Sequence, residues 1–223
     1  PADQRARDHV AILLLGGAYV VLSLIYLPPA FVALVAVALV LASVELHEAL
    51  KKQGMTSAIV PIVIGSVAIS VGSYFAGRQE PVIFSTTSVL LASLALTVLA
   101  SMVWRMPKGV AGYVRDVAAS LLIIGYVPLL GSFAALMLAE GRGTLRVVTF
   151  MLIVVMSDTG GYVAGVLFGK HPMAPKISPK KSWEGVAGSL VFATVAGVCM
   201  AIFVLHVPFW VGIILSVSLV VVG

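Results

Sequence analysis

Long apolar runs alternate with short polar segments along almost the whole chain. A membrane-spanning helix needs about 20 apolar residues, and in hydrocarbon each span must satisfy its own backbone hydrogen bonds. The pattern therefore predicts an all-α fold, a polytopic transmembrane helix bundle with about eight spans. The predicted spans are Val10–Leu27, Pro29–Leu50, Ser57–Ala76, Val82–Trp104, Asp116–Ala139, Leu145–Phe168, Glu184–His206 and Pro208–Gly223.

The same pattern sets the expected organisation of the chain. The last run is short and stops in mid-run at Gly223, so we expect a truncated C-terminus. Residues 1–223 are assigned to a single integral membrane domain, with N-terminal helices over 1–140 and site-bearing helices and a loop over 145–206. Pro61 lies near the start of the third span, and Pro128 is expected to kink the fifth.

Composition excludes two broad classes of protein. Hydrophobic residues make up 61% of the chain and charged residues only 10%, with a mean hydropathy of +1.13. Soluble domains carry roughly 45–50% apolar and about 25% charged residues, so lipid must cover this chain. The net charge of +5 comes without a nucleic-acid-binding motif or a basic face with interleaved aromatics, so no nucleic-acid partner is expected.

The basic residues instead predict a membrane orientation. If the spans alternate from a cytoplasmic N-terminus, eleven basic residues lie inside and three outside, a strong positive-inside bias. This orientation places the loop Gly169–Ser182 in the cytoplasm, where nucleotides are found. The inside set is Arg5, Arg7, Lys51, Lys52, Arg105, Lys108, Arg115, Lys170, Lys176, Lys180 and Lys181, and the outside set is Arg78, Arg142 and Arg146.

Candidate chemistry gathers between Met156 and Gly188. Asp158 lies within an apolar span, where a carboxylate costs roughly 2.5–3.5 kcal/mol and so needs a metal, a cation or a polar cavity. Satisfaction by the neighbouring hydroxyls of Ser157 and Thr159 is the alternative. Glycines at 161, 165 and 169 give a smooth face on which another helix can pack, within the chain or across a dimer.

A second candidate feature follows in the loop. Ser178 and Pro179 suit the N-cap and first position of a helix, which would place Lys180 and Lys181 in its first turn. The helix dipole disfavours cations there, so the arrangement indicates a phosphate site, although the lysines could serve topology alone. Glu184 could orient the lysines, bind a metal or act as a favourable first-turn acid.

Two other groups of polar residues carry weaker signals. His171, alone in the loop, is expected to be solvated. Arg115 and Asp116 enter the fifth span together, as a local ion pair or as part of the site.

Three segments, S-D-x-G-x-Y, F-G-K-H and S-P-K-K-[ST]-x-E, occur in this order between Ser157 and Glu184. In this arrangement the sequence closely resembles bacterial phosphatidate cytidylyltransferases, also called CDP-diacylglycerol synthases. The resemblance implies transfer of CMP from CTP to phosphatidate, giving CDP-diacylglycerol and pyrophosphate, in the inner (plasma) membrane with the site facing the cytoplasm. It implies Mg²⁺ as cofactor, with or without a second cation. A homodimer is the expected assembly, since the glycine face could pack across a dimer.

The resemblance also implies site residues. Asp158 matches the acidic residue of the metal site and, with Lys180 and Lys181, is assigned to catalysis. The substrate-binding set that it implies is Lys176, Ser178, Ser182 and Glu184. The family's downstream H-G-G-x-x-D-R-x-D segment does not occur before Gly223, so the 223 residues alone are expected to lack part of the metal site. The alternatives are a CTP-dependent polyprenol or lipid kinase, and a membrane transporter.

Overall fold

The computed structural model describes residues 17, 19–78, 84–174 and 178–222. The chain divides into two compact units, Pro1–Thr144 and Leu145–Gly223, which are described separately. Six described helical segments are long and apolar enough to cross a membrane. These segments are Pro28–Lys52, Ile59–Ala76, Thr86–Lys108, Tyr113–Ala139, Gly143–Phe168 and Trp183–Leu205.

These six segments confirm the second to seventh predicted spans to within a few residues. In the predicted first span, Val10–Leu27, residues 10–16 and 18 lie outside the described residues, and residues 17 and 19–26 are helical. In place of the eighth, the apolar helix Phe209–Val222 has only 14 residues, which is short for a span. The all-α membrane fold is therefore supported, and the described residues contain six helices that are long and apolar enough to span a membrane.

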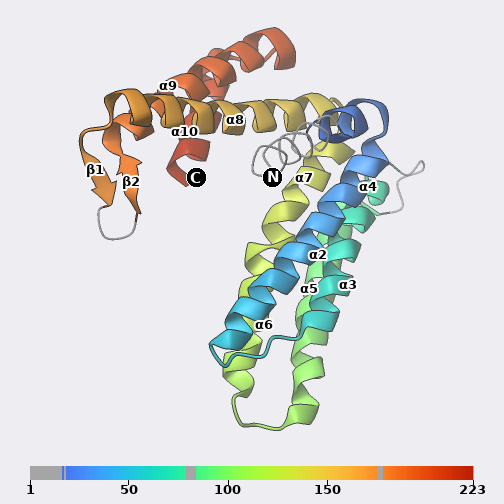
Figure 1. Ribbon diagram of the computed structural model, residues 1–223. Coiled ribbons are helices and arrows are strands. Elements are labelled where there is room, and N and C mark those ends of the chain that lie inside the picture. Colours follow the sequence, from blue (N-terminus) through green and yellow to red (C-terminus); the bar gives the residue numbers. More distant parts are fainter. Residues whose placement is uncertain (1–16, 18, 79–83, 175–177, 223) are drawn as a thin grey trace, which may run out of the picture. The chain divides into compact units, whose positions relative to one another are not determined.

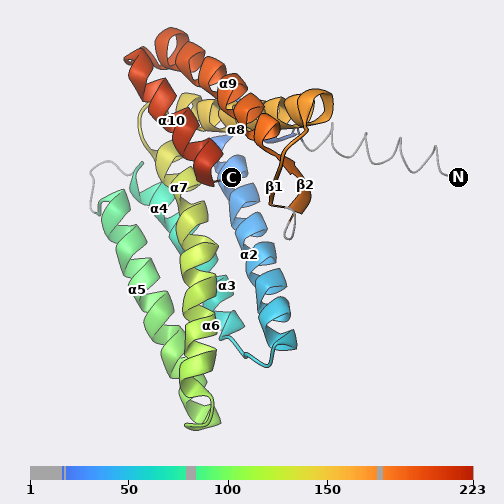
Figure 2. The same cartoon turned by 90° about the vertical axis from the view of Figure 1, so that its left-hand side faces the viewer.

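The first unit is a bundle of helices that run side by side in both views (Figures 1 and 2). Its elements are α2 (Pro28–Lys52), α3 (Ile59–Val67), the π-helical turn η1 (Ala68–Gly72), α4 (Ser73–Ala76), α5 (Thr86–Arg105), the 3₁₀ turn η2 (Met106–Lys108), α6 (Tyr113–Tyr126) and α7 (Pro128–Ala139). Pro128 starts α7 directly after α6 ends, as expected for a residue that interrupts helical hydrogen bonding. The buried core centres on Ile62, Ile123 and Ile124.

A buried ion pair ties one end of this bundle together. Arg105 donates through Nε to Asp116 Oδ2 at 2.6 Å, and the two side chains are only 7% and 8% exposed. The other guanidinium nitrogens donate to the carbonyls of Gly109 and Ala111, which closes the α5–α6 loop. Asp116 Oδ1 accepts a hydrogen bond from the backbone N–H of Thr56 at 2.7 Å. The pair therefore links α5 and α6 to the segment between α2 and α3.

Replacing Asp116 with Asn is expected to destabilise the protein by about 3–5 kcal/mol, because it leaves the buried guanidinium of Arg105 without its counter-ion. The matched control is Arg115→Gln, which removes an exposed charge next to Asp116 and should change stability by no more than about 0.5 kcal/mol. Unfolding of purified protein in detergent, followed by loss of helical circular dichroism, measures both. Equal stabilities of the two variants would show that the pair does not hold the bundle together.

The second unit contains three helices and a short hairpin. It comprises most of α8 (Gly143–Phe168), then β1 (Pro172–Ala174), β2 (Ser178–Ser182), α9 (Trp183–Met200), the π-helical turn η3 (Ala201–Leu205) and α10 (Phe209–Val222). The two strands are antiparallel, with Pro172 opposite Ser182 and Ala174 opposite Ser178. The hairpin follows the end of α8 and leads into α9 (Figure 1).

The predicted helix start at Ser178 is wrong. Residues 178–182 form β2, and α9 begins only at Trp183. Ser182 is the N-cap, and its Oγ accepts a hydrogen bond from the backbone N–H of Gly185 at 3.1 Å. Pairing with β1 satisfies backbone groups of the preceding segment, so the cap at Ser182 prevails over the one predicted at Ser178.

This later helix start changes the electrostatic argument for the lysines. Lys180 and Lys181 lie in an extended strand, so the dipole conflict inferred for a first helical turn does not arise. Glu184 occupies the first turn of α9 instead, where the helix dipole favours a carboxylate. The case for a phosphate site therefore depends on the charges of the hairpin.

The glycine face of α8 does pack against another helix, as predicted, and that helix is α9 of the same chain. A Cβ added to Gly160 would lie 2.5 Å from the carbonyl oxygen of Gly188, so side chains larger than hydrogen cannot fit. Gly185 of α9 meets Gly161 in the same way, at 3.1 Å from its carbonyl oxygen. The backbones therefore approach closely, as small residues allow in membrane helices.

Replacing Gly160 with Ala is expected to destabilise the second unit by about 1–3 kcal/mol, the usual effect of overpacking. Gly165→Ala is the matched control on the same helix, since its Cβ would meet the nearest heavy atom, Ser182 Oγ, at an ordinary 3.6 Å. The control should be neutral or stabilising by up to about 1 kcal/mol, because Ala favours helix over Gly. Thermal unfolding of both variants decides the matter, and a Gly160→Ala protein as stable as the control would contradict the packing.

Candidate functional site

The basic segment predicted to bind phosphates lies on the β1–β2 hairpin. Lys180 and Lys181 belong to β2, and Lys181 is exposed, as is Lys170 just after α8. Ser178 is half-buried at the start of β2. Lys176 lies outside the described residues. The hairpin thus brings basic residues to the connection between two apolar helices.

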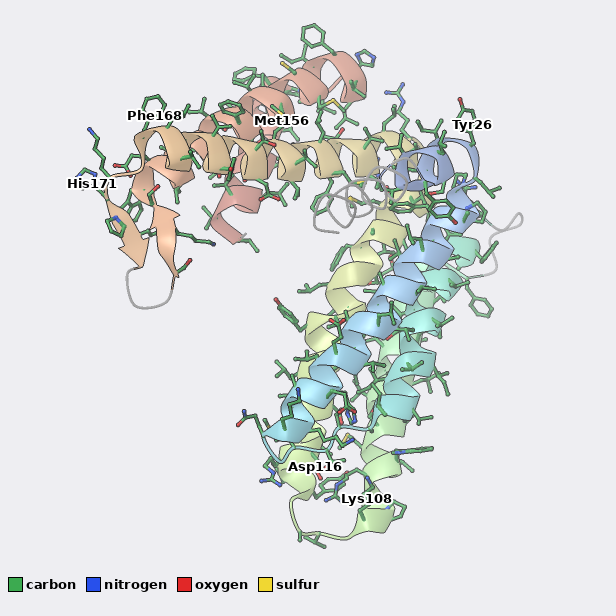
Figure 3. All side chains as sticks on the ribbon, in the orientation of Figure 1. Tyr26, Lys108, Asp116, Met156, Phe168 and His171 are labelled. Carbon is green, nitrogen blue, oxygen red and sulfur yellow. The ribbon has the colours of Figure 1, made fainter. Side chains whose placement is uncertain are left out.

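Glu184 bonds to His171 rather than to a described lysine. Its Oε1 lies 2.6 Å from His171 Nδ1, and its Oε2 accepts a hydrogen bond from the His171 backbone N–H at 3.3 Å. The backbone N–H of Trp183 donates to the His171 carbonyl at 3.0 Å. His171 is therefore fastened to the start of α9, beyond the end of α8 at Phe168 (Figure 3).

Sequence reasoning missed this pair. It treated His171 as a lone solvated residue, and it left Glu184 to orient lysines or bind a metal. The two residues are 13 positions apart and meet only because the hairpin returns the chain. The available signal was the combination of a histidine directly after one span with the single carboxylate that opens the next.

Asp158 is exposed on α8 and makes no hydrogen bond or ion pair within the part of the chain that the structure describes. The neighbouring hydroxyl of Thr159 donates to the carbonyl of Val155 instead, at 2.7 Å. The carbonyl of Ser157 accepts a hydrogen bond from Ser189 of α9 at 2.8 Å. Local hydroxyls therefore do not satisfy the carboxylate, which favours a functional partner over the structural alternative.

Asp158 and the hairpin lie at different positions along the axis of α8. Phe168 lies ten positions after Asp158, which corresponds to about 15 Å along a helix. In Figure 3, Met156 lies in the middle of α8 and His171 lies beyond the end of this helix. The structure therefore gathers Lys181, Ser182 and Glu184 at the hairpin, and it leaves Asp158 further along α8.

The described residues could bind Mg²⁺ only together with oxygen ligands from water or substrate. The described residues contain no group of three or more His, Cys, Asp or Glu side chains that could hold a metal ion. Mg²⁺ is commonly held by one or two carboxylates together with water and substrate phosphates. Asp158 can supply one such carboxylate, so the fit depends on oxygen ligands from the substrate.

A helical membrane protein has the features of an enzyme acting on phosphorylated substrates when one helix carries a carboxylate with no partner among the described residues and a basic hairpin follows that helix. The comparisons agree with this class. The Cytidylyltransferase family matches residues 6–223, and the chain belongs to that family.

Three relatives named phosphatidate cytidylyltransferase align over nearly the whole chain. The protein of Mycobacterium leprae is 37% identical over 227 residues, covering 95% of this chain and 70% of the relative. That of Mycobacterium bovis is 35% identical over 234 residues, covering 98% and 74%. That of Mycobacterium tuberculosis H37Rv is 35% identical, covering 98% and 69%.

Proposed function

We propose that this chain is a CTP:phosphatidate cytidylyltransferase, which makes CDP-diacylglycerol for phospholipid synthesis. The observation that carries the proposal is the 35–37% identity to phosphatidate cytidylyltransferases over at least 95% of the chain. A phosphate oxygen of phosphatidate attacks the α-phosphorus of CTP, the bond from that phosphorus to the bridging oxygen breaks, and pyrophosphate leaves. CMP is thereby joined to the lipid phosphate.

The chain's own residues have separate roles in this proposal. Lys180 and Lys181, with Lys176 and Ser178, neutralise and orient the phosphates of the two anionic substrates. Asp158 holds the divalent metal, which supplies charge stabilisation at the phosphoryl oxygens when bound. The Oγ of Ser182 already accepts from Gly185, so its hydroxyl hydrogen remains to donate to a phosphate oxygen.

The test of this proposal is a product assay with purified full-length protein, CTP, phosphatidate and Mg²⁺. Cytidylyl transfer yields one pyrophosphate for each CDP-diacylglycerol. Neither product should form unless CTP and phosphatidate are both present. A lipid kinase would release CDP instead, and a transporter would release neither product. Absence of pyrophosphate in the presence of both substrates would reject the proposal.

The proposed location is the inner (plasma) membrane, with the hairpin facing the cytoplasm. The eleven-to-three distribution of basic residues supports this orientation. A homodimer remains a prediction, because the glycine face that could have served it packs against α9 of the same chain.

Cysteine labelling is expected to confirm the orientation. In a Cys199→Ala background, a Lys170→Cys variant should react with an impermeant thiol reagent only after the inner face is opened. Lys170 suits the purpose because it is exposed at the end of α8. Labelling from outside in intact cells would contradict the proposed orientation, because the hairpin would then face away from the compartment that contains CTP.

A further inference from the structure

We infer that His171 binds a substrate phosphate through its imidazole Nε2, and that Glu184 orients the ring for this contact. The inference rests on the proposed function and adds a residue to its site.

The hydrogen bonds fix one side of the imidazole and leave the other open. A carboxylate only accepts hydrogen bonds, so His171 Nδ1 carries a proton and donates it to Glu184 Oε1. This contact points Nε2 away from Glu184, and the His171 side chain is 78% exposed while that of Glu184 is 24% exposed. In metal sites, a carboxylate on one ring nitrogen commonly orients a histidine whose other nitrogen binds the metal. The same hydrogen bond would orient the ring for a phosphate at Nε2.

The backbone bonds make the orientation specific. The His171 N–H donates to Glu184, and its carbonyl accepts from Trp183, so the residue is held on both sides of its Cα. These two bonds hold the backbone, and the bond of Nδ1 to Glu184 then sets the direction of the imidazole. The ring is therefore presented at a fixed place at the base of the hairpin.

The excess of positive charge around His171 favours binding of an anion. Between Thr159 and Gly223 the sequence contains a single acidic residue, Glu184, against four lysines. That carboxylate bonds to His171, and the exposed Lys170 and Lys181 make no ion pair with the described residues. With the carboxylate at Nδ1 and a phosphate at Nε2, the imidazolium form donates to both. The anion can come from CTP or from the phosphatidate headgroup.

Two substitutions separate the two ring nitrogens. In His171→Asn the amide nitrogen takes the place of Nδ1, so the bond to Glu184 can persist while Nε2 is lost. In His171→Gln the amide nitrogen reaches the place of Nε2 instead. His171→Ala removes both.

The experiment measures kcat/KM for each substrate, binding of inorganic pyrophosphate with Mg²⁺ by calorimetry, and trypsin cleavage after Lys181, all in full-length protein. We expect His171→Asn to be cleaved like wild type and to lose about 10- to 100-fold in kcat/KM, the value of a charge-assisted hydrogen bond. A loss confined to CTP and pyrophosphate assigns the contact to the nucleotide, and a loss confined to phosphatidate assigns it to the lipid.

Each remaining outcome also decides the inference. Wild-type turnover and wild-type pyrophosphate binding in His171→Asn would overturn the inference. His171 would then serve only to hold the hairpin to α9. If the Asn variant is cleaved faster, the Gln variant decides, since better activity than His171→Ala supports the contact and equal activity rejects it. If wild type shows no cytidylyl transfer, the proposed function fails. Pyrophosphate binding then tests the inference alone. Weaker binding to His171→Asn than to wild type would support it. Equal binding to the two proteins, or no binding to wild type, would reject it.

Discussion

Replacing Asp158 with Asn in the full-length protein is expected to lower kcat/KM by about a thousandfold or more while the fold is kept. The substitution hardly changes volume but removes the charge that we propose to hold a divalent metal. Stabilisation of phosphoryl oxygens by such a metal contributes several kcal/mol, and each 1.36 kcal/mol is tenfold in rate. Asp158 has no partner among the described residues, so the fold does not depend on its charge. The measurement is turnover at saturating Mg²⁺ together with thermal unfolding.

The neighbouring residue provides the control for Asp158. Thr159→Val removes a hydroxyl that bonds only to the carbonyl of Val155, so activity should stay within a fewfold of wild type. Near-normal turnover of Asp158→Asn at saturating Mg²⁺ would remove the metal role from this carboxylate.

Replacing Lys180 and Lys181 together with Gln is expected to reduce kcat/KM by about a hundredfold to ten-thousandfold, since charge-assisted contacts contribute about 1.5–3 kcal/mol each. We expect the free energy of unfolding to change by no more than about 0.5 kcal/mol, the usual limit for a surface substitution such as that of the exposed Lys181. A gain in helix stability, which a position in the first turn of α9 would have implied, is not expected because both lysines lie in β2. Kinetics and unfolding of correctly inserted protein measure the two effects.

The matched control for these lysines is Lys51→Gln with Lys52→Gln, at the end of α2. It removes the same charge from the first unit and should leave kcat/KM unchanged in protein that inserts correctly. Normal kinetics for the Lys180 and Lys181 variant, with a rising misinserted fraction, would show that these lysines serve topology alone.

Hydropathy predicted eight spans, of which the second to seventh match described helices that are long and apolar enough to cross a membrane. Local signals were enough for the break at Pro128 and the packing face of α8. These features depend on residues close in sequence. The glycine face was predictable because small residues every four positions lie on one side of a helix. What the pattern left open was the partner, which proved to be α9 of the same chain.

The failures share a different cause. Ser178 and Pro179 are compatible with a helix start and with a strand, and pairing with residues 172–174 decided for the strand. Arg115 and Asp116 are adjacent, but adjacent residues on a helix do not face each other, and Asp116 pairs with Arg105 across a loop. The bond of His171 to Glu184 likewise required the hairpin. Contacts made by chain reversal leave little trace in local sequence.

The central claim is that this chain transfers the cytidylyl group rather than a terminal phosphoryl group. The most direct measurement follows separately labelled phosphates of CTP into the products formed with phosphatidate. The account predicts that the α-phosphate label appears in the lipid and the γ-phosphate label in pyrophosphate. Label from the γ-phosphate in the lipid, or no lipid label from either position, would contradict it.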